Sequence, residues 1–195
     1  MPVVPRVVAS AALALAALLL VAPICAEAQV PIVDEIKIGA LAHDFAFFTH
    51  HVETGTDINL EVLFIPPDLL GLIGSPRPHI GADINTSGNT SDGYFGLTWG
   101  LPLLPRLLGA PAGVFLNGSL GGAVQDGLTG TQTTVPPPGR KLLGSTLLIR
   151  ESAELGYQIT PVLSVSAFID HISNANLAPR NAGLTNAGAR LGVRF

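Results

Sequence analysis

The residues best suited to chemistry are His171 and Ser173, two positions apart near the C-terminal end of the sequence. In an extended strand, residues two apart lie on the same face, so an imidazole and a hydroxyl there can share a hydrogen bond. A histidine so placed can take the serine proton while the oxygen attacks an acyl carbonyl. Because a three-residue motif is a weak signal, a polar pair at a strand end is the ordinary alternative. The elements around the pair must decide between the two.

Alternating side chains predict that the pair lies on a strand. Leucine, valine, alanine and isoleucine occupy every second position from Leu163 to Ile169, and His171 and Ser173 continue that face. The same period of two, with glycine-rich separators, predicts strands near residues 35–44, 57–64, 80–85, 94–99, 114–121, 145–158, 161–173 and 186–195. The sequence therefore predicts an all-β fold with eight antiparallel strands.

Composition indicates which face of these strands points inward. The chain is 48% hydrophobic and only 12% charged, with a positive mean hydropathy. A soluble barrel would turn its apolar face inward, whereas a membrane barrel turns it toward lipid. The opposite face carries charges that can form an ion network inside a narrow lumen: Asp57, Glu61, Asp83, Arg150, Glu154, Asp170, Arg190 and Arg194. We therefore predict an eight-stranded transmembrane β-barrel, whose lumen is too narrow for an open pore.

Residues 1–28 are predicted to be a cleaved signal peptide, leaving residues 29–195 as the barrel. Arg6 precedes the apolar segment 7–22, and Ala26-Glu27-Ala28 is a small-residue cleavage site. The segment is shorter than the roughly 20 residues of a spanning helix. Cys25, the chain's single cysteine, leaves with the signal peptide, so no cysteine-ligated metal and no disulfide are expected.

The ends of the barrel strands predict its orientation and its partners. Alternation up to the terminal Phe195 resembles the signature that the barrel-assembly machinery recognises in outer-membrane proteins. With the N-terminus starting in the periplasm, the seventh strand ends at the outer leaflet, so His171 and Ser173 face lipopolysaccharide. The net charge of −4 is spread along the chain without a basic run, which argues against nucleic acid as a partner.

Several segments together resemble the lipid A 3-O-deacylases of the PagL type and the related acyloxyacyl hydrolases of alphaproteobacteria. The box in the seventh strand is the most specific part, and the resemblance spans nearly all of residues 29–195. The matching segments are His171-Ile172-Ser173-Asn174-Ala175, Asn181-Ala182-Gly183-Leu184, Leu41-Ala42-His43-Asp44, Arg77-Pro78-His79-Ile80-Gly81, Arg150-Glu151-Ser152-Ala153-Glu154-Leu155 and the terminal strand.

The resemblance implies an outer-membrane hydrolase that removes an ester-linked acyl chain from lipid A without a cofactor. It assigns Ser173 as nucleophile, His171 as base and Asn174 as a residue that helps to stabilise the oxyanion. The family's glutamate, fourteen residues after the histidine, is replaced by Thr185, which can hold an imidazole but cannot stabilise its positive form electrostatically. The chain is therefore either an active lipid A deacylase or a catalytically impaired structural or lipopolysaccharide-binding barrel.

Glu151 is a candidate substitute for the missing acid. If residues 159–161 form a short turn, strand pairing places Glu151 within about one register step of His171 on the outward face. An interfacial or structural carboxylate is the alternative reading. A metal site at His43, Asp44, His50 and His51 is weakly suggested, but a solvated histidine cluster is the commoner case.

Overall fold

The computed structural model describes residues 32–104, 113–131 and 133–195 of the protein. The predicted signal peptide and its cleavage site lie outside these residues, so the prediction of export by a signal peptide remains a prediction. Within the described ranges, no helix is both long enough and apolar enough to cross a bilayer.

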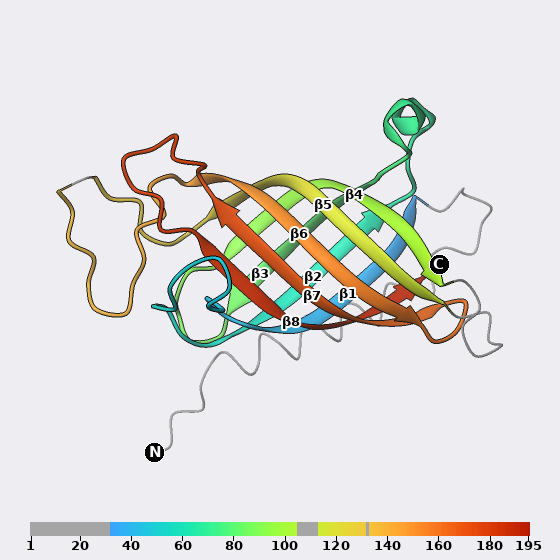
Figure 1. The fold of residues 1–195 in the computed structure, drawn as a ribbon, viewed down its shortest axis with the longest axis horizontal. Helices are drawn as coiled ribbons and strands as arrows, with labels where there is room; N and C mark the ends of the chain where they lie inside the picture. Colours follow the sequence, from blue (N-terminus) through green and yellow to red (C-terminus); the bar gives the residue numbers. More distant parts are fainter. Residues whose placement is uncertain (1–31, 105–112, 132) are drawn as a thin grey trace, which may run out of the picture. The chain divides into compact units, whose positions relative to one another are not determined.

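Eight antiparallel strands form a closed barrel, as the sequence predicted (Figure 1). Each strand pairs with the next one along the chain, and β1 closes the sheet by pairing with β8. Closure leaves no unpaired strand edge, which a sheet in a bilayer requires. The strands are β1 Val33–Ala42, β2 Thr56–Phe64, β3 Arg77–Asn85, β4 Asp92–Leu104, β5 Val114–Gln125, β6 Leu147–Gln158, β7 Leu163–Ser173 and β8 Leu184–Arg194.

The alternation along each strand sets the two faces of the barrel. In β2, Asp57, Asn59 and Glu61 are buried, whereas Ile58 and Leu60 are exposed. The apolar face therefore points outward and the polar face inward, as predicted for a barrel whose solvent is lipid.

Paired charges and aromatic rings fill the interior. The Arg150 guanidinium donates to Asp170 Oδ2 at 2.7 Å and stacks over the Tyr94 ring, 3.5 Å from its centroid. Arg190 lies 2.9 Å from Glu154 and stacks over Phe168 in the same way. These contacts occupy the lumen with side chains, so the barrel is a packed structure.

The predicted set of inward charges omits several buried ones, Glu35, Lys37 and Asp92, and it includes one residue that is not buried. Lys37 of β1 is also buried in the lumen, where it forms an ion pair with Glu154 at 2.5 Å. Arg194 pairs with Glu35 at 3.6 Å, but its side chain is 43% exposed, because the residue lies at the end of β8. It therefore belongs to the rim of the barrel and is not part of the buried network.

The two ends of the barrel differ in their connections (Figure 1). At one end, β2 and β3 are joined through a short 3₁₀ helix, η1 Asp68–Ile73, and the turn between β6 and β7 is tight. The other end, here called the loop end, carries loops 43–55, 86–91, 126–146 and 174–183. Strand β7 finishes at the loop end, which brings Ser173 next to these loops.

Candidate active site

His171 and Ser173 occupy the last positions of β7 on its outward face. Both side chains are partly exposed, while Asp170 and Ile172, which alternate with them, are buried on the inward face. This confirms the predicted parity of the strand. The imidazole and the hydroxyl therefore face the same side of the barrel wall, where an acylated lipid can approach from the bilayer.

Thr185 holds the imidazole of His171. The β7–β8 register pairs the two residues directly, and His171 Nδ1 lies 2.8 Å from Thr185 Oγ1. Thr185 lies on the outward face but is fully buried, and loop 43–55 folds back onto it. In that contact the Phe45 N–H donates to the Thr185 carbonyl oxygen at 2.6 Å. Thr185 thus occupies the orienting position that the resemblance assigns to an acid.

A threonine at this position constrains the imidazole less than a carboxylate would. A carboxylate only accepts, so it fixes the proton on Nδ1 and leaves Nε2 free to act as a base. A hydroxyl can accept from Nδ1–H, which has the same effect, but it can also donate to Nδ1 and place the proton on Nε2. Thr185 therefore orients the ring without selecting its reactive tautomer.

Glu151 lies where the sequence predicted it. It pairs directly with His171 across β6 and β7, and Ile149 pairs with Ser173 in the same ladder. Its carboxylate is exposed on the outward face and forms no hydrogen bond within the described part of the chain. Glu151 therefore places a negative charge beside the imidazole, while the bond to Nδ1 comes from Thr185.

Asn174 is buried just after the strand, and its donors are engaged by loops 126–146 and 174–183. Its side-chain amide donates to the Leu143 carbonyl at 2.7 Å and also to the Arg180 carbonyl. Its backbone N–H donates to Asn181 Oδ1. In this arrangement Asn174 shapes the loop around Ser173, and its role toward an oxyanion stays a prediction.

Comparison with known proteins identifies the family. The family model of lipid A 3-O-deacylase (PagL) matches residues 58–194. The chain belongs to this family. Among curated proteins, no sequence match was found.

The solved structure of one outer-membrane enzyme shares the fold. The crystal structure of the outer membrane enzyme PagL superposes with a TM-score of 0.61 at 16% identity, covering 83% of this chain and 99% of that one. Neisserial surface protein A (NspA) gives 0.49 at 12% identity over 83% and 96% of the two chains. The Yersinia pestis outer membrane protein Ail gives 0.41 at 16% identity over 84% and 99%. As a family member with an apolar outer face, the protein is a bacterial outer-membrane barrel, which confirms the predicted location.

Two residues near His171 were not anticipated from the sequence. The ring of Phe48, in loop 43–55, contacts the imidazole edge to face, with centroids 5.5 Å apart. Gly183 also lies against the imidazole, where a Cβ atom would come within 2.9 Å of His171 Cε1. Gly183 also has a φ of 62°, a conformation that favours glycine. No local pattern in the sequence reveals these two contacts with His171.

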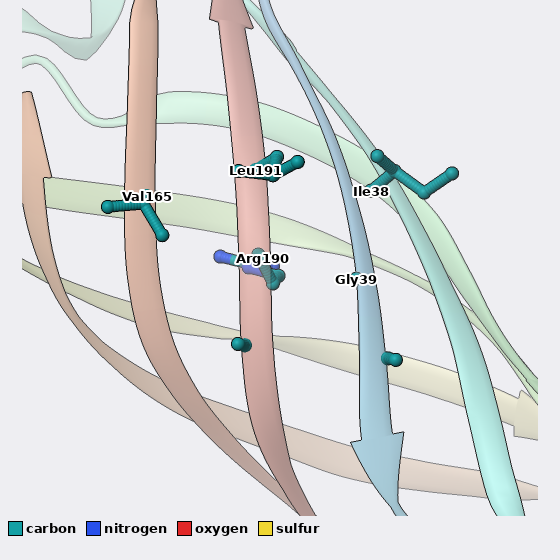
Figure 2. A pocket seen from close by; sticks show the side chains of 7 residues that line it. Ile38, Gly39, Val165, Arg190 and Leu191 are labelled. Carbon is teal, nitrogen blue, oxygen red and sulfur yellow. The ribbon is translucent and has the colours of Figure 1, made fainter. Parts of the chain in front are cut away.

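Two apolar hollows interrupt the outward face of the barrel. One, of about 270 Å³, lies across β7, β8 and β1, where small residues are flanked by Ile38, Val165 and Leu191 (Figure 2). The other, of about 470 Å³, is bounded by Phe95, Gly122, Ile149, Asn174 and Leu177, among other residues. The second hollow lies closer to the candidate nucleophile, because Ile149 pairs with Ser173 and Asn174 follows it.

His43 belongs to a buried contact that ties loop 43–55 to the barrel. Its Nδ1 lies 2.8 Å from Asp57 Oδ2, and its Nε2 lies 3.1 Å from Glu53 Oε2. Although burial opposes the charged form, the hydrogen bonds to these carboxylates raise the pKa of His43 to about 9. Within the described ranges, no group of three or more histidine, cysteine, aspartate and glutamate side chains is arranged to bind a metal ion.

Proposed function

We propose that the protein hydrolyses an ester-linked acyl chain of lipid A, with Ser173 as nucleophile and His171 as general base. One observation carries the proposal. His171 and Ser173 share the outward face at the end of β7, and the imidazole is held through Nδ1 by Thr185. That arrangement leaves Nε2 as the nitrogen available to the hydroxyl whenever the proton is on Nδ1.

The reaction then follows the two steps of serine esterases. Ser173 Oγ attacks the ester carbonyl while His171 accepts its proton, and the imidazolium returns the proton to the departing sugar oxygen. Water, deprotonated by the same imidazole, next attacks the acyl-enzyme and releases the fatty acid. Among the described residues, Ser173 Oγ forms no hydrogen bond, and the expected one to His171 is not formed, so the proposal requires the hydroxyl to turn toward Nε2 when substrate binds.

The neighbouring hollow supports an acyl chain as the group that is transferred. Its lining residues Phe95, Gly122 and Ile149 stand in one row across β4, β5 and β6, and this row ends at Ser173. The Phe95 ring lies over Gly122, which has no side chain, and both residues line the hollow. A chain bound there would place its ester beside the hydroxyl.

Glu151 is proposed to stabilise the imidazolium by its charge, since the neutral Thr185 cannot. The carboxylate occupies the position directly across from His171 but lacks a hydrogen bond to it. Glu151→Gln keeps the shape and removes the charge. We expect it to slow hydrolysis, and unchanged hydrolysis by a folded variant would make Glu151 a structural residue.

The test is release of fatty acid from lipid A by purified protein in detergent, measured by mass spectrometry. Wild type should release a 3-hydroxy fatty acid, and Ser173→Ala should reduce release by a factor on the order of 10³ or more. Ser173→Ala should change the unfolding free energy by only about 0.5 kcal/mol, as is usual for surface substitutions. Ser166→Ala is the matched control, because it removes the same oxygen from the inward face of β7, where Ser166 binds Glu154.

Other results would change the assignment. If Ser173→Ala and Ser166→Ala released fatty acid equally well, Ser173 would not be the nucleophile. If folded wild type released none, the protein would be better described as a structural or lipopolysaccharide-binding barrel.

A further inference from the structure

Lys141 joins two segments that contact the candidate base. Its side chain is buried in loop 126–146, and its ammonium donates to Asp44, to Thr49 Oγ1 at 3.0 Å and to the Gly183 carbonyl at 3.0 Å. Three donors on one ammonium are thereby all used. Two of the acceptors belong to loop 43–55, and the third immediately precedes β8.

Asp44 is the partner that shapes loop 43–55 around this ammonium. Besides Lys141, its carboxylate accepts the backbone N–H groups of Val52 and Glu53, at 2.6 and 3.0 Å. Its own N–H donates to Asn186 Oδ1 in β8. The loop is therefore folded on itself and attached to β8, with an ion pair buried at its centre.

Two of the three acceptors of the ammonium, Thr49 and Gly183, lie beside His171 or beside a residue that contacts it. Thr49 follows Phe48, whose ring lies against the imidazole. Gly183 itself lies against the imidazole, because a Cβ atom added at this residue would be 3.3 Å from His171 Nε2. One ammonium thus joins Thr49, which follows Phe48, to Gly183, so both residues that contact the imidazole are attached to the same cation.

We propose that Lys141 is a positioning residue of the candidate active site, which holds Phe48 and Gly183 against the imidazole of His171. The proposal rests on the proposed function, because positioning has a catalytic consequence only if His171 is the base. Its physical basis is that a rigidly placed ring keeps the base within reach of the hydroxyl, and that an aromatic edge excludes water and competing rotamers.

Arg140 provides a matched comparison within the same loop. Its guanidinium donates to Glu53 at 3.2 Å and to the Gly88 carbonyl at 3.3 Å, and its side chain is partly exposed. These contacts join loop 126–146 to loops 43–55 and 86–91 without involving Thr49 or Gly183. Replacing either residue by methionine removes one positive charge from loop 126–146. A difference between the two variants therefore reports on contacts at His171 and not on net charge.

The first measurement is the access of reagent to His171. Full-length protein in detergent micelles is treated with diethylpyrocarbonate, and modification of His171 is followed by peptide mass spectrometry. Lys141→Met and Phe48→Leu should each accelerate this modification several-fold, whereas Arg140→Met and Phe45→Leu should leave it unchanged. Phe45 is the aromatic control, because it lies in the same exposed loop and only its backbone is bonded to Thr185.

The second measurement is turnover of lipid A. Lys141→Met should lower kcat by roughly 10- to 100-fold, the range expected for a small displacement of a catalytic group. The double variant Lys141→Met/Phe48→Leu should be no slower than the worse single variant, because residues that act through one contact are not additive. Fully additive losses would overturn the proposal.

The rate at which the reagent modifies His171 tests the positioning role of Lys141 independently of lipid A hydrolysis. If wild type releases no fatty acid but the modification rates change as expected, the positioning role stands and the enzymatic function fails. If Lys141→Met and Arg140→Met show the same modification rate, the positioning role fails even in an active enzyme.

Thr49→Val covers the case in which Lys141→Met does not fold. It removes one acceptor of the ammonium while the buried pair with Asp44 remains. It should expose His171 in the same direction as Phe48→Leu. A folded Thr49→Val with wild-type reagent access would overturn the proposal.

Discussion

Polar side chains in the lumen are paired, whereas among the described residues several at the outward end of β7 have no partner. In the lumen, Arg150 and Arg190 each combine a carboxylate partner with an aromatic ring at about the same distance. On the outward face, Ser173 and Glu151 have no hydrogen-bond partner within the described residues, and His171 has one partner, Thr185.

This difference separates structural polarity from candidate chemistry. A buried charge without partners is costly, so the lumenal charges must be paired for the barrel to be stable. Polar groups at the outer surface can remain unpaired, because headgroups and water solvate them there. Unpaired groups beside a partly exposed histidine therefore remain available to a ligand, which is what the proposed function requires.

The comparison predicts the largest loss of unfolding free energy when a charged side chain is removed from the lumen. Arg150→Met leaves Asp170 and Asp83 buried without their main cation, and it should lower the unfolding free energy by about 3–5 kcal/mol. Urea unfolding of the folded barrel in lipid vesicles measures this loss. The control is Arg194→Gln at the exposed rim, which should cost at most about 1 kcal/mol. Equal losses for the two variants would mean that burial does not distinguish these charges.

Thr185 tests the outward side of the comparison. Thr185→Val removes the hydrogen bond to His171 Nδ1 with little change in shape, and it should reduce hydrolysis by about 10- to 100-fold. Thr185→Glu supplies an acceptor that fixes the reactive tautomer and should raise hydrolysis about 10-fold or more over wild type. Unfolding free energies measured beside the kinetics show whether either variant acts through stability. A folded Thr185→Val with full activity would exclude an orienting role for this residue.

The smallest effect is expected from a change of pH, which alters the stability of loop 43–55. The pKa of His43, normally near 6.5, is raised to about 9, so its stabilising contribution is complete below pH 6.5 and is lost as the pH rises through 9. Glu53 is also buried, which opposes its charged form, but its hydrogen bond to His43 and those from Lys141 and Thr90 lower its pKa from 4.5 to about 2. Its contribution is complete above pH 4.5 and is lost as the pH falls through 2.

Loop 43–55 should therefore resist proteolysis best between about pH 4.5 and 6.5. Cleavage rates in this loop should rise toward pH 9, and His43→Gln should abolish that rise. An identical alkaline profile in His43→Gln would show that another group controls the loop.

The sequence alone determined the architecture and the faces of the strands. A period of two is a local property, so it placed His171 and Ser173 outward and Asp57 and Glu61 inward without knowledge of any partner. It also located Glu151 beside His171, since a tight turn between β6 and β7 fixes the register. By the same parity Lys37 could have been recognised as an inward charge, and it was missed.

Only the tertiary structure decided how the site is enclosed. The bond from Thr185 to His171 fixes which nitrogen is held, the amide of Asn174 is directed to loop carbonyls, and Lys141 connects loop 43–55 to Gly183. Lys141 and Asp44 are 97 residues apart, and their loops have no periodic pattern. Such contacts depend on how closed-barrel geometry brings separate loops together at one end, which local propensity does not encode.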